Sequence, residues 1–177
     1  MPKAVFKYMK NIKSILAIFG LLIAFSFAAS AQNVTLTSPD GDKINVTGQN
    51  GKVVVLAVGA TWLPLSKNQV IVTNKLAKKY AGKDVVIYFV ATDSALAKSK
   101  NFASDEEIRA FVTKNKLGVK ILRDSEGLLT LKKFGVDQLP SFVILGKDGK
   151  SFGEPFGGID PDSDISIPIS KAIDKLL

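Results

Sequence analysis

The sequence contains no cysteine and no histidine. Without cysteine, the chain cannot form a disulfide, use a thiolate nucleophile, or hold an iron–sulfur cluster or a thiolate zinc site. Without histidine, it has no Ser-His-Asp triad and no imidazole metal ligand. The only methionines are Met1 and Met9, so thioether ligands are confined to the first residues. We therefore expect no catalytic residue, no bound cofactor and no metal site.

Residues 1–31 have the pattern of a secretory signal peptide, which makes residues 32–177 the expected mature domain. Four lysines without an acid precede an apolar run over residues 15–29, and Ala29-Ser30-Ala31 fits an A-x-A cleavage site. The alternative is a permanent membrane anchor, but this run is shorter than the roughly 20 residues that span a bilayer. We expect an exported protein, periplasmic or extracellular, with no stable membrane span after cleavage.

Charge is modest once this leader is set aside. The remaining chain has 20 basic and 16 acidic residues, a net charge of +4. Its lysines are dispersed, which is typical of a solvated surface and not of a nucleic-acid-binding patch. We expect no nucleic acid among its partners.

Hydrophobic patterning predicts strands alternating with helices. Two alternating segments around a Pro-Asp-Gly turn predict an N-terminal β-hairpin, and the β-branched runs 53–58, 85–90 and 141–145 predict buried strands. Ser104 and Glu107 form an S-x-x-E capping box before an amphipathic helix. We further expect helices near residues 70–80, 128–134 and 165–177, a short strand at 119–122 and a returning strand at 151–156. This order predicts a three-layer α/β sandwich around a mixed central sheet.

Three segments carry a family resemblance. Residues 51–56 and 60–66, the latter reading ATWLPLS, resemble the strand and active-site loop of TlpA-type thioredoxin-like proteins, whose loop usually reads A-T-W-C-P-P-C. Residues 134–144 are similar to the family's stretch around a cis-proline, and 147–150 with Gly157-Gly158 match its terminal hairpin. The resemblance spans about residues 34–177 and implies a thioredoxin-like fold of the TlpA/redoxin type, with a cis bond at Leu139-Pro140.

The two positions that match the family's cysteines are Leu63 and Ser66. Thioredoxin-like oxidoreductases act by thiolate attack on a disulfide, and leucine has no nucleophile. Serine cannot replace the thiol, because an alkoxide at neutral pH needs a base and the chain has no histidine to act as one. Redoxin peroxidase chemistry also needs a cysteine. We therefore expect that thiol-disulfide activity has been lost, whatever the fold suggests.

The resemblance still implies a binding groove, although the cysteines are absent. In the family, the two loops line a shallow groove, and the backbone before the proline pairs with an extended peptide. The matching groove residues here are Trp62, Leu63, Pro64, Ser66, Leu139 and Pro140. The competing interpretation is that Trp62 and Leu63 pack against their own domain.

The first functional hypothesis is thus an exported, non-enzymatic thioredoxin-like protein that binds a protein or peptide in the cell envelope through this groove. The second is a thiol-disulfide oxidoreductase or peroxidase-family redox protein that acts with an external thiol or cofactor. A third is a packing role in an envelope complex through another face. A disulfide-reduction assay separates the first two hypotheses, because only the second predicts turnover. Charged substitutions at Trp62 and Leu63 separate the third, because a complex formed through another face should survive them.

Overall fold

The computed structural model describes residues 33–160 and 163–177, and within these ranges a seven-stranded sheet forms the centre of the molecule. The predicted signal peptide lies outside the described residues. The strand order is β2-β1-β5-β4-β3-β6-β7. The strands are β1 (Thr35–Thr37), β2 (Lys43–Asn45), β3 (Val53–Gly59), β4 (Val85–Ala91), β5 (Lys120–Arg123), β6 (Ser141–Leu145) and β7 (Phe156–Gly157).

The sheet is mixed, as the sequence predicts. β3, β4 and β5 run parallel, whereas β6 is antiparallel to β3 and β1 is antiparallel to β5. The predicted N-terminal hairpin is present, since β1 and β2 pair with Leu36 opposite Ile44. All seven residues of β3 are buried, which explains the continuous β-branched run there: a central parallel strand is covered on both faces.

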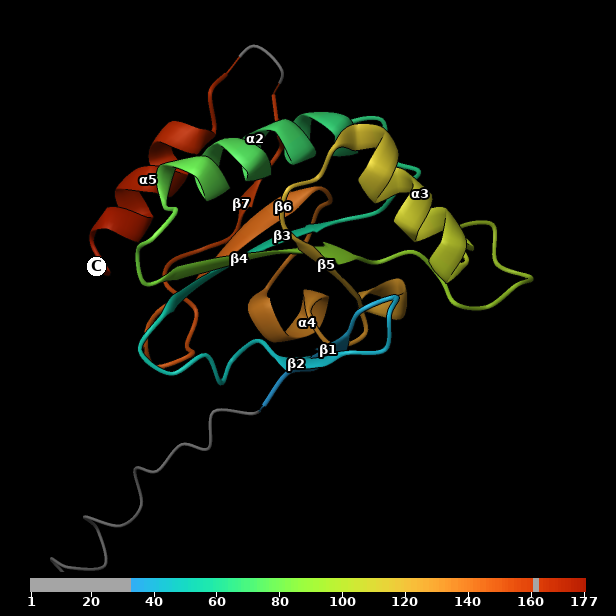
Figure 1. The fold of residues 1–177 in the computed structure, drawn as a ribbon, viewed down its shortest axis with the longest axis horizontal. Helices are drawn as coiled ribbons and strands as arrows, with labels where there is room; N and C mark the ends of the chain where they lie inside the picture. The colour runs from blue at the N-terminus through green and yellow to red at the C-terminus, as the bar shows by residue number, and fades with distance from the viewer. Residues whose placement is uncertain (1–32, 161–162) are drawn as a thin grey trace, which may run out of the picture. The chain divides into compact units, whose positions relative to one another are not determined.

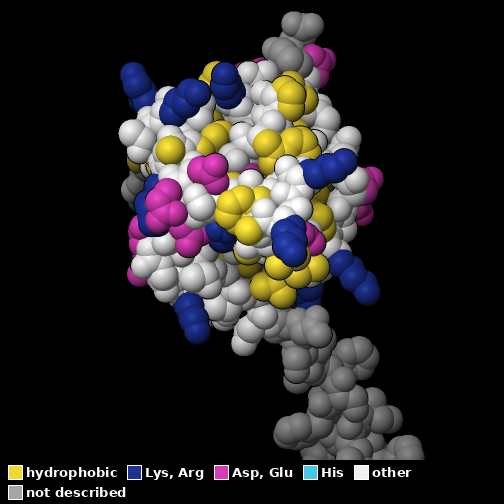
Figure 2. Space-filling model, turned by 90° about the vertical axis from the view of Figure 1, so that its right-hand side faces the viewer, with side chains coloured by type: hydrophobic (Ala, Val, Ile, Leu, Met, Phe, Trp, Pro, Cys, Tyr) yellow, Lys and Arg dark blue, Asp and Glu magenta, His cyan; other side chains and the backbone are white. Residues whose placement is uncertain are grey.

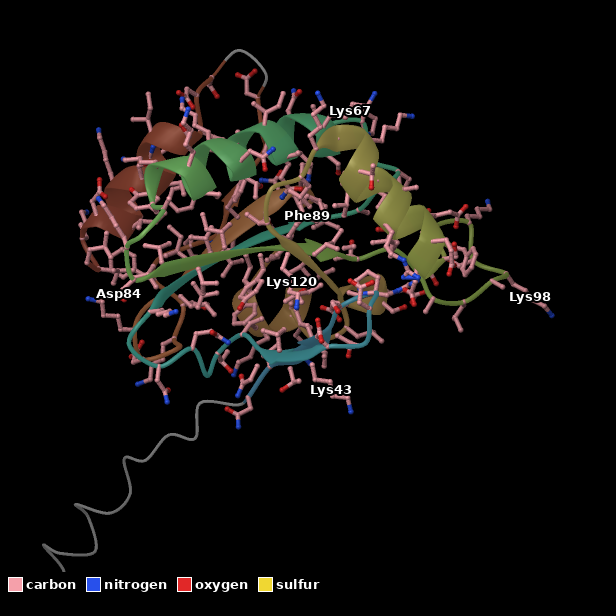
Figure 3. All side chains as sticks on the ribbon, in the orientation of Figure 1. Lys43, Lys67, Asp84, Phe89, Lys98 and Lys120 are labelled. Atoms are coloured by element: carbon pink, nitrogen blue, oxygen red, sulfur yellow. The ribbon has the colours of Figure 1, made fainter. Side chains whose placement is uncertain are left out.

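Helices cover both faces, which gives three layers (Figure 1). α2 (Ser66–Lys79), α3 (Asp105–Asn115) and α5 (Ser166–Asp174) lie on one face, and the short α4 (Leu131–Phe134) lies on the other. Alternate β3 residues divide between the two cores. Val55 packs with the three-helix side, and Leu56 packs with α4 and the hairpin. Phe89 of β4 points into the three-helix side, where its ring lies 5.7 Å from that of Phe111 (Figure 3).

Local signals explain where several helices begin and end. Ser104 accepts a hydrogen bond from the backbone N–H of Glu107, whose carboxylate accepts one from the backbone N–H of Ser104. Gly135 ends α4 in the left-handed region at φ +68°. The predicted helix over 128–134 is shorter than expected, because residues 128–130 form a turn between the 3₁₀ helix η1 (Ser125–Gly127) and α4.

The predicted returning strand over 151–156 is present only at its two ends. Ser151 forms an isolated bridge with Leu145, and the paired strand β7 begins at Phe156. Gly153 has φ +73° and Pro155 lacks an amide hydrogen, so neither continues a strand ladder. Within the described ranges, no helix is both long and apolar enough to cross a membrane.

Candidate functional site

Two loops meet at the end of the sheet where β3 and β4 finish. The first, residues 60–65, joins β3 to α2, and the second, residues 138–140, leads into β6. They lie together because the last residues of β3 pair with the start of β6, with Val58 opposite Ser141. Figure 2 looks onto this end of the molecule and shows hydrophobic side chains gathered across it, with a few charged groups between them.

The first loop is held by its own hydrogen bonds. The backbone N–H of Leu63 donates to the carbonyl of Ala60 at 3.2 Å, and the N–H of Ser66 donates to the carbonyl of Leu63 at 3.1 Å. The Ser66 hydroxyl donates to the same Ala60 carbonyl at 2.6 Å. Leu63 and Ser66 are therefore the two ends of a tight turn that leads into α2.

Asp93 ties this loop to the end of β4. Its carboxylate, which is fully buried, accepts hydrogen bonds from the backbone N–H of Thr61 at 3.0 Å and from the Thr61 hydroxyl at 2.6 Å. A buried carboxylate is tolerated where it is well hydrogen-bonded. Asp93 therefore fixes the position of the residue before Trp62.

Gln69 joins the two strands that carry these loops, β3 and β6. This buried side chain of α2 donates through Nε2 to the carbonyls of Val58 at 3.1 Å and Ser141 at 3.0 Å. Its Oε1 has no hydrogen-bond partner among the described residues. A Cβ at position 59 would lie 2.2 Å from that oxygen, so the close approach requires Gly59. Gln69 thus keeps the end of β3 and the start of β6 in register.

The second loop contains a cis peptide bond between Leu139 and Pro140, as the resemblance implies. The Ser141 hydroxyl donates to the Gln138 carbonyl at 2.7 Å and closes the loop. Within residues 33–160 and 163–177, neither the N–H nor the carbonyl of Leu139 makes a hydrogen bond. Leu139 therefore presents a free backbone edge beside the pairing of β6 with β7.

The structure divides the six predicted groove residues. Trp62 is 52% exposed, Pro64 is exposed, and Leu63 and Leu139 are half-buried. Ser66 and Pro140 are both buried. An occupant of the groove could touch the first four, whereas Ser66 and Pro140 shape the loops from beneath.

Trp62 stands between two hollows. One has a volume of ≈ 280 Å³ and is lined by Trp62, Thr92, Ser94, Ser99, Asn101, Glu126, Leu131 and Leu139. The other has a volume of ≈ 400 Å³ and is lined by Thr61, Trp62, Leu63, Pro64, Lys67, Phe111, Lys114 and Asn115. The two hollows therefore adjoin at Trp62, which lines both of them.

Sequence reasoning missed most of the polar groups around this ring. Thr92 and Asp93 are exceptions, because they end a predicted strand at the carboxyl edge of the sheet, where α/β folds place ligands, although they fit an ordinary strand-to-loop transition equally well. Glu126 comes from a turn more than thirty residues away in the chain, and only the tertiary fold brings it to Trp62. Gln69 did leave a signal, because it is a polar residue on the apolar face of α2.

Comparison with known sequences identifies relatives over most of the chain. The model of the AhpC/TSA family matches residues 28–150. The thiol-disulfide oxidoreductase ResA of Bacillus thuringiensis subsp. konkukian (strain 97-27) is 30% identical over 124 residues, which cover 70% of this chain and 66% of that relative. The match thus spans just under two thirds of the relative's length.

Comparison with solved structures shows a thioredoxin-like fold. A secreted Mycobacterium tuberculosis disulfide oxidoreductase homologous to E. coli DsbE superposes with a TM-score of 0.62 at 21% identity, covering 84% of this chain and 100% of that one. A thioredoxin-like protein from Aeropyrum pernix superposes with a TM-score of 0.62 at 16% identity, covering 96% and 98%. The predicted fold class is confirmed.

Proposed function

The chain belongs to the AhpC/TSA family, and from that premise we propose that it is an exported thioredoxin-like protein that binds an extended segment of a partner without thiol chemistry. The observation that carries the proposal is the half-exposed Trp62, which lies between two hollows. It is next to Leu63, and Leu63 and Ser66 stand at the two positions that match the cysteines of thioredoxin-like oxidoreductases. The partner is a protein or peptide of the cell envelope.

The residues present support the proposed loss of redox chemistry. No thiol exists anywhere in the chain, and disulfide exchange requires a thiolate that attacks sulfur. The Ser66 hydroxyl is buried and donates to a backbone carbonyl, so it faces neither solvent nor a base. We therefore do not propose for this chain the thiol-disulfide oxidoreductase activity for which its relatives are named.

Retention of binding is supported by the exposed surface. Trp62 keeps about half of its surface in solvent, so its ring is available to an occupant of the groove. Tryptophan is among the side chains that most often dominate binding energy at interfaces. The unpaired backbone of Leu139 adds a site for strand addition, in which a peptide pairs with main-chain groups.

Two assays on the purified protein test the proposal. Insulin disulfide reduction and peroxide consumption should both stay at the uncatalysed rate, and measurable turnover would contradict the loss of redox chemistry. Affinity capture from the host's exported fraction should recover a partner that is lost with Leu63→Asp. The matched control is Ile71→Asp, an equal change of charge on the exposed side of α2. Equal capture by both variants would place the interaction on another face.

A further inference from the structure

The smaller hollow beside Trp62 has one acidic wall. Trp62, Leu131 and Leu139 supply apolar surface, and hydroxyl and amide groups supply most of the remainder. Glu126 is the one ionisable side chain among the lining residues. The volume of ≈ 280 Å³ lies at the small end of ligand pockets, which suits a single side chain of a bound peptide.

Glu126 is held over this hollow by a constrained turn. Its backbone has φ +58°, a left-handed conformation that is uncommon for a residue other than glycine. The N–H of Glu126 donates to the carbonyl of Thr92 at 3.0 Å. The hydroxyl of Ser94, which is fully buried, donates to Oε1 of Glu126 at 2.9 Å. Backbone and side chain are thus both fixed toward the end of β4.

The turn is also anchored from behind. Asp124 is buried, and its carboxylate accepts hydrogen bonds from the backbone N–H groups of Leu129 and Thr130 and from the Thr130 hydroxyl. Residues in sparsely populated backbone conformations persist where their surroundings over-determine them, and they cluster at ligand sites. The position of Glu126 is therefore set before any ligand arrives.

The Glu126 carboxylate has no counter-ion of its own in the described part of the chain. No lysine or arginine there forms an ion pair with it, and no group donates to its Oε2. Arg123, three residues earlier in the chain, directs its two terminal nitrogens to Asp105 and to the carbonyls of Ser94 and Ala103, and its Nε has no hydrogen-bond partner among the described residues. A cation placed in the hollow would find the Glu126 carboxylate and the exposed side chain of Trp62 among its lining groups.

We propose that this hollow receives an arginine or lysine side chain of the segment bound in the groove, with arginine preferred. This inference rests on the proposed function and names the chemistry of its partner. A guanidinium can stack on the Trp62 ring and donate to the Glu126 carboxylate at the same time. The apolar side chains of Leu131 and Leu139 would cover the methylene groups of the bound residue.

The test uses Trp62 as the reporter, because it is the only tryptophan in the chain. The purified protein is titrated with three acetylated, amidated pentapeptides, Thr-Val-Xaa-Val-Thr, in which Xaa is arginine, its neutral isostere citrulline, or glutamate. Both the fluorescence and the single indole N–H resonance are followed. The arginine peptide should bind about 10-fold more tightly than the citrulline peptide, since a hydrogen bond to a charged group contributes that order of discrimination.

Matched variants assign the preference to the carboxylate. Glu126→Gln should remove the preference for arginine and leave the affinity for the citrulline peptide unchanged. Glu154→Gln makes the same change of charge at an exposed residue that lines neither hollow, and it should keep the preference. Equal binding of the three peptides, or a preference that survives Glu126→Gln, would overturn the inference and leave the groove intact. Binding of none of them, with no change at Trp62, would contradict the groove itself.

Discussion

Restoring the two cysteines provides a quantitative test of the first loop. Leu63 and Ser66 are the ends of a hydrogen-bonded turn, with the N–H of Ser66 3.1 Å from the carbonyl oxygen of Leu63. The Cα atoms at the ends of such a turn lie less than about 7 Å apart, which is within the range that a disulfide bridges. The double variant Leu63→Cys, Ser66→Cys should therefore form an intramolecular disulfide in air or oxidised glutathione.

The size of the effect follows from the length of the loop that is closed. Chain-entropy arguments give a stabilisation of about 2 kcal/mol at 25 °C for a loop of four residues. For a chain of this size, that corresponds to a rise in melting temperature of about 4–8 °C. The comparison is between oxidised and reduced forms of one variant, so the cost of losing the Ser66 hydroxyl's bond to Ala60 cancels.

The assay combines thiol counting with thermal unfolding followed by circular dichroism. The oxidised variant should contain no free thiol and unfold at the higher temperature, and dithiothreitol should reverse both results. A variant that is folded but keeps both thiols free under oxidising conditions would refute the assignment of Leu63 and Ser66 to the ends of this turn. The matched control is Ile71→Cys with Ser66→Cys, whose positions share no such turn, and it should stay reduced.

Three further predictions concern the supports of the site. Gln69→Ala should lower the free energy of unfolding by about 2–4 kcal/mol in urea, because two buried carbonyls lose their donor; a change below about 0.5 kcal/mol would contradict its bridging role. Ser104→Ala should cost about 1 kcal/mol, since it removes the N-cap of α3, and an unchanged urea midpoint would refute this. Stability should be flat from about pH 6 to 8, because the chain has no histidine, and should fall below about pH 4. The hydrogen bond and ion pair with Lys120 lower the pKa of Asp42, and the hydrogen bonds from Ser104 lower the pKa of Glu107. The stability that these two carboxylates contribute is therefore present above the ordinary carboxyl pKa and is lost as the pH falls through the lowered pKa values. A sharp loss of stability near pH 6.5 would contradict this.

Much of the fold could be predicted because its signals are local. The β-branched runs of β3 and β4 identify buried strands, and the Ser104 capping box identifies the start of α3. The loop residues Trp62 and Leu139 could be found because Trp62 lies in the segment that resembles the family's active-site loop and Leu139 precedes the proline of the family's cis-proline stretch. These features depend on neighbours in the sequence, so a single chain is enough to detect them.

The chemistry of the site could not be predicted to the same depth, because it depends on contacts between distant segments. The resemblance predicts that Ser66 lines the groove, but its hydroxyl points inward and donates to the carbonyl of Ala60. Glu126 lies in a polar turn that any surface could carry, and its hydrogen bonds with Thr92 and Ser94, distant in the sequence, direct it to the hollow. The predicted returning strand is interrupted at Gly153, which has a positive φ that the alternation of side chains does not reveal.

Site-specific photocrosslinking tests the central claim, binding through the groove without a thiol, most directly. Benzoyl-phenylalanine is placed at position 63 in the full-length protein and, as a matched control, at the exposed position 71 on α2. After irradiation of the exporting host, position 63 should give discrete adducts that weaken when Trp62→Ala is added, and position 71 should give none of them. The same adducts at both positions would contradict the account, and so would the absence of any adduct at position 63 in a folded, exported protein.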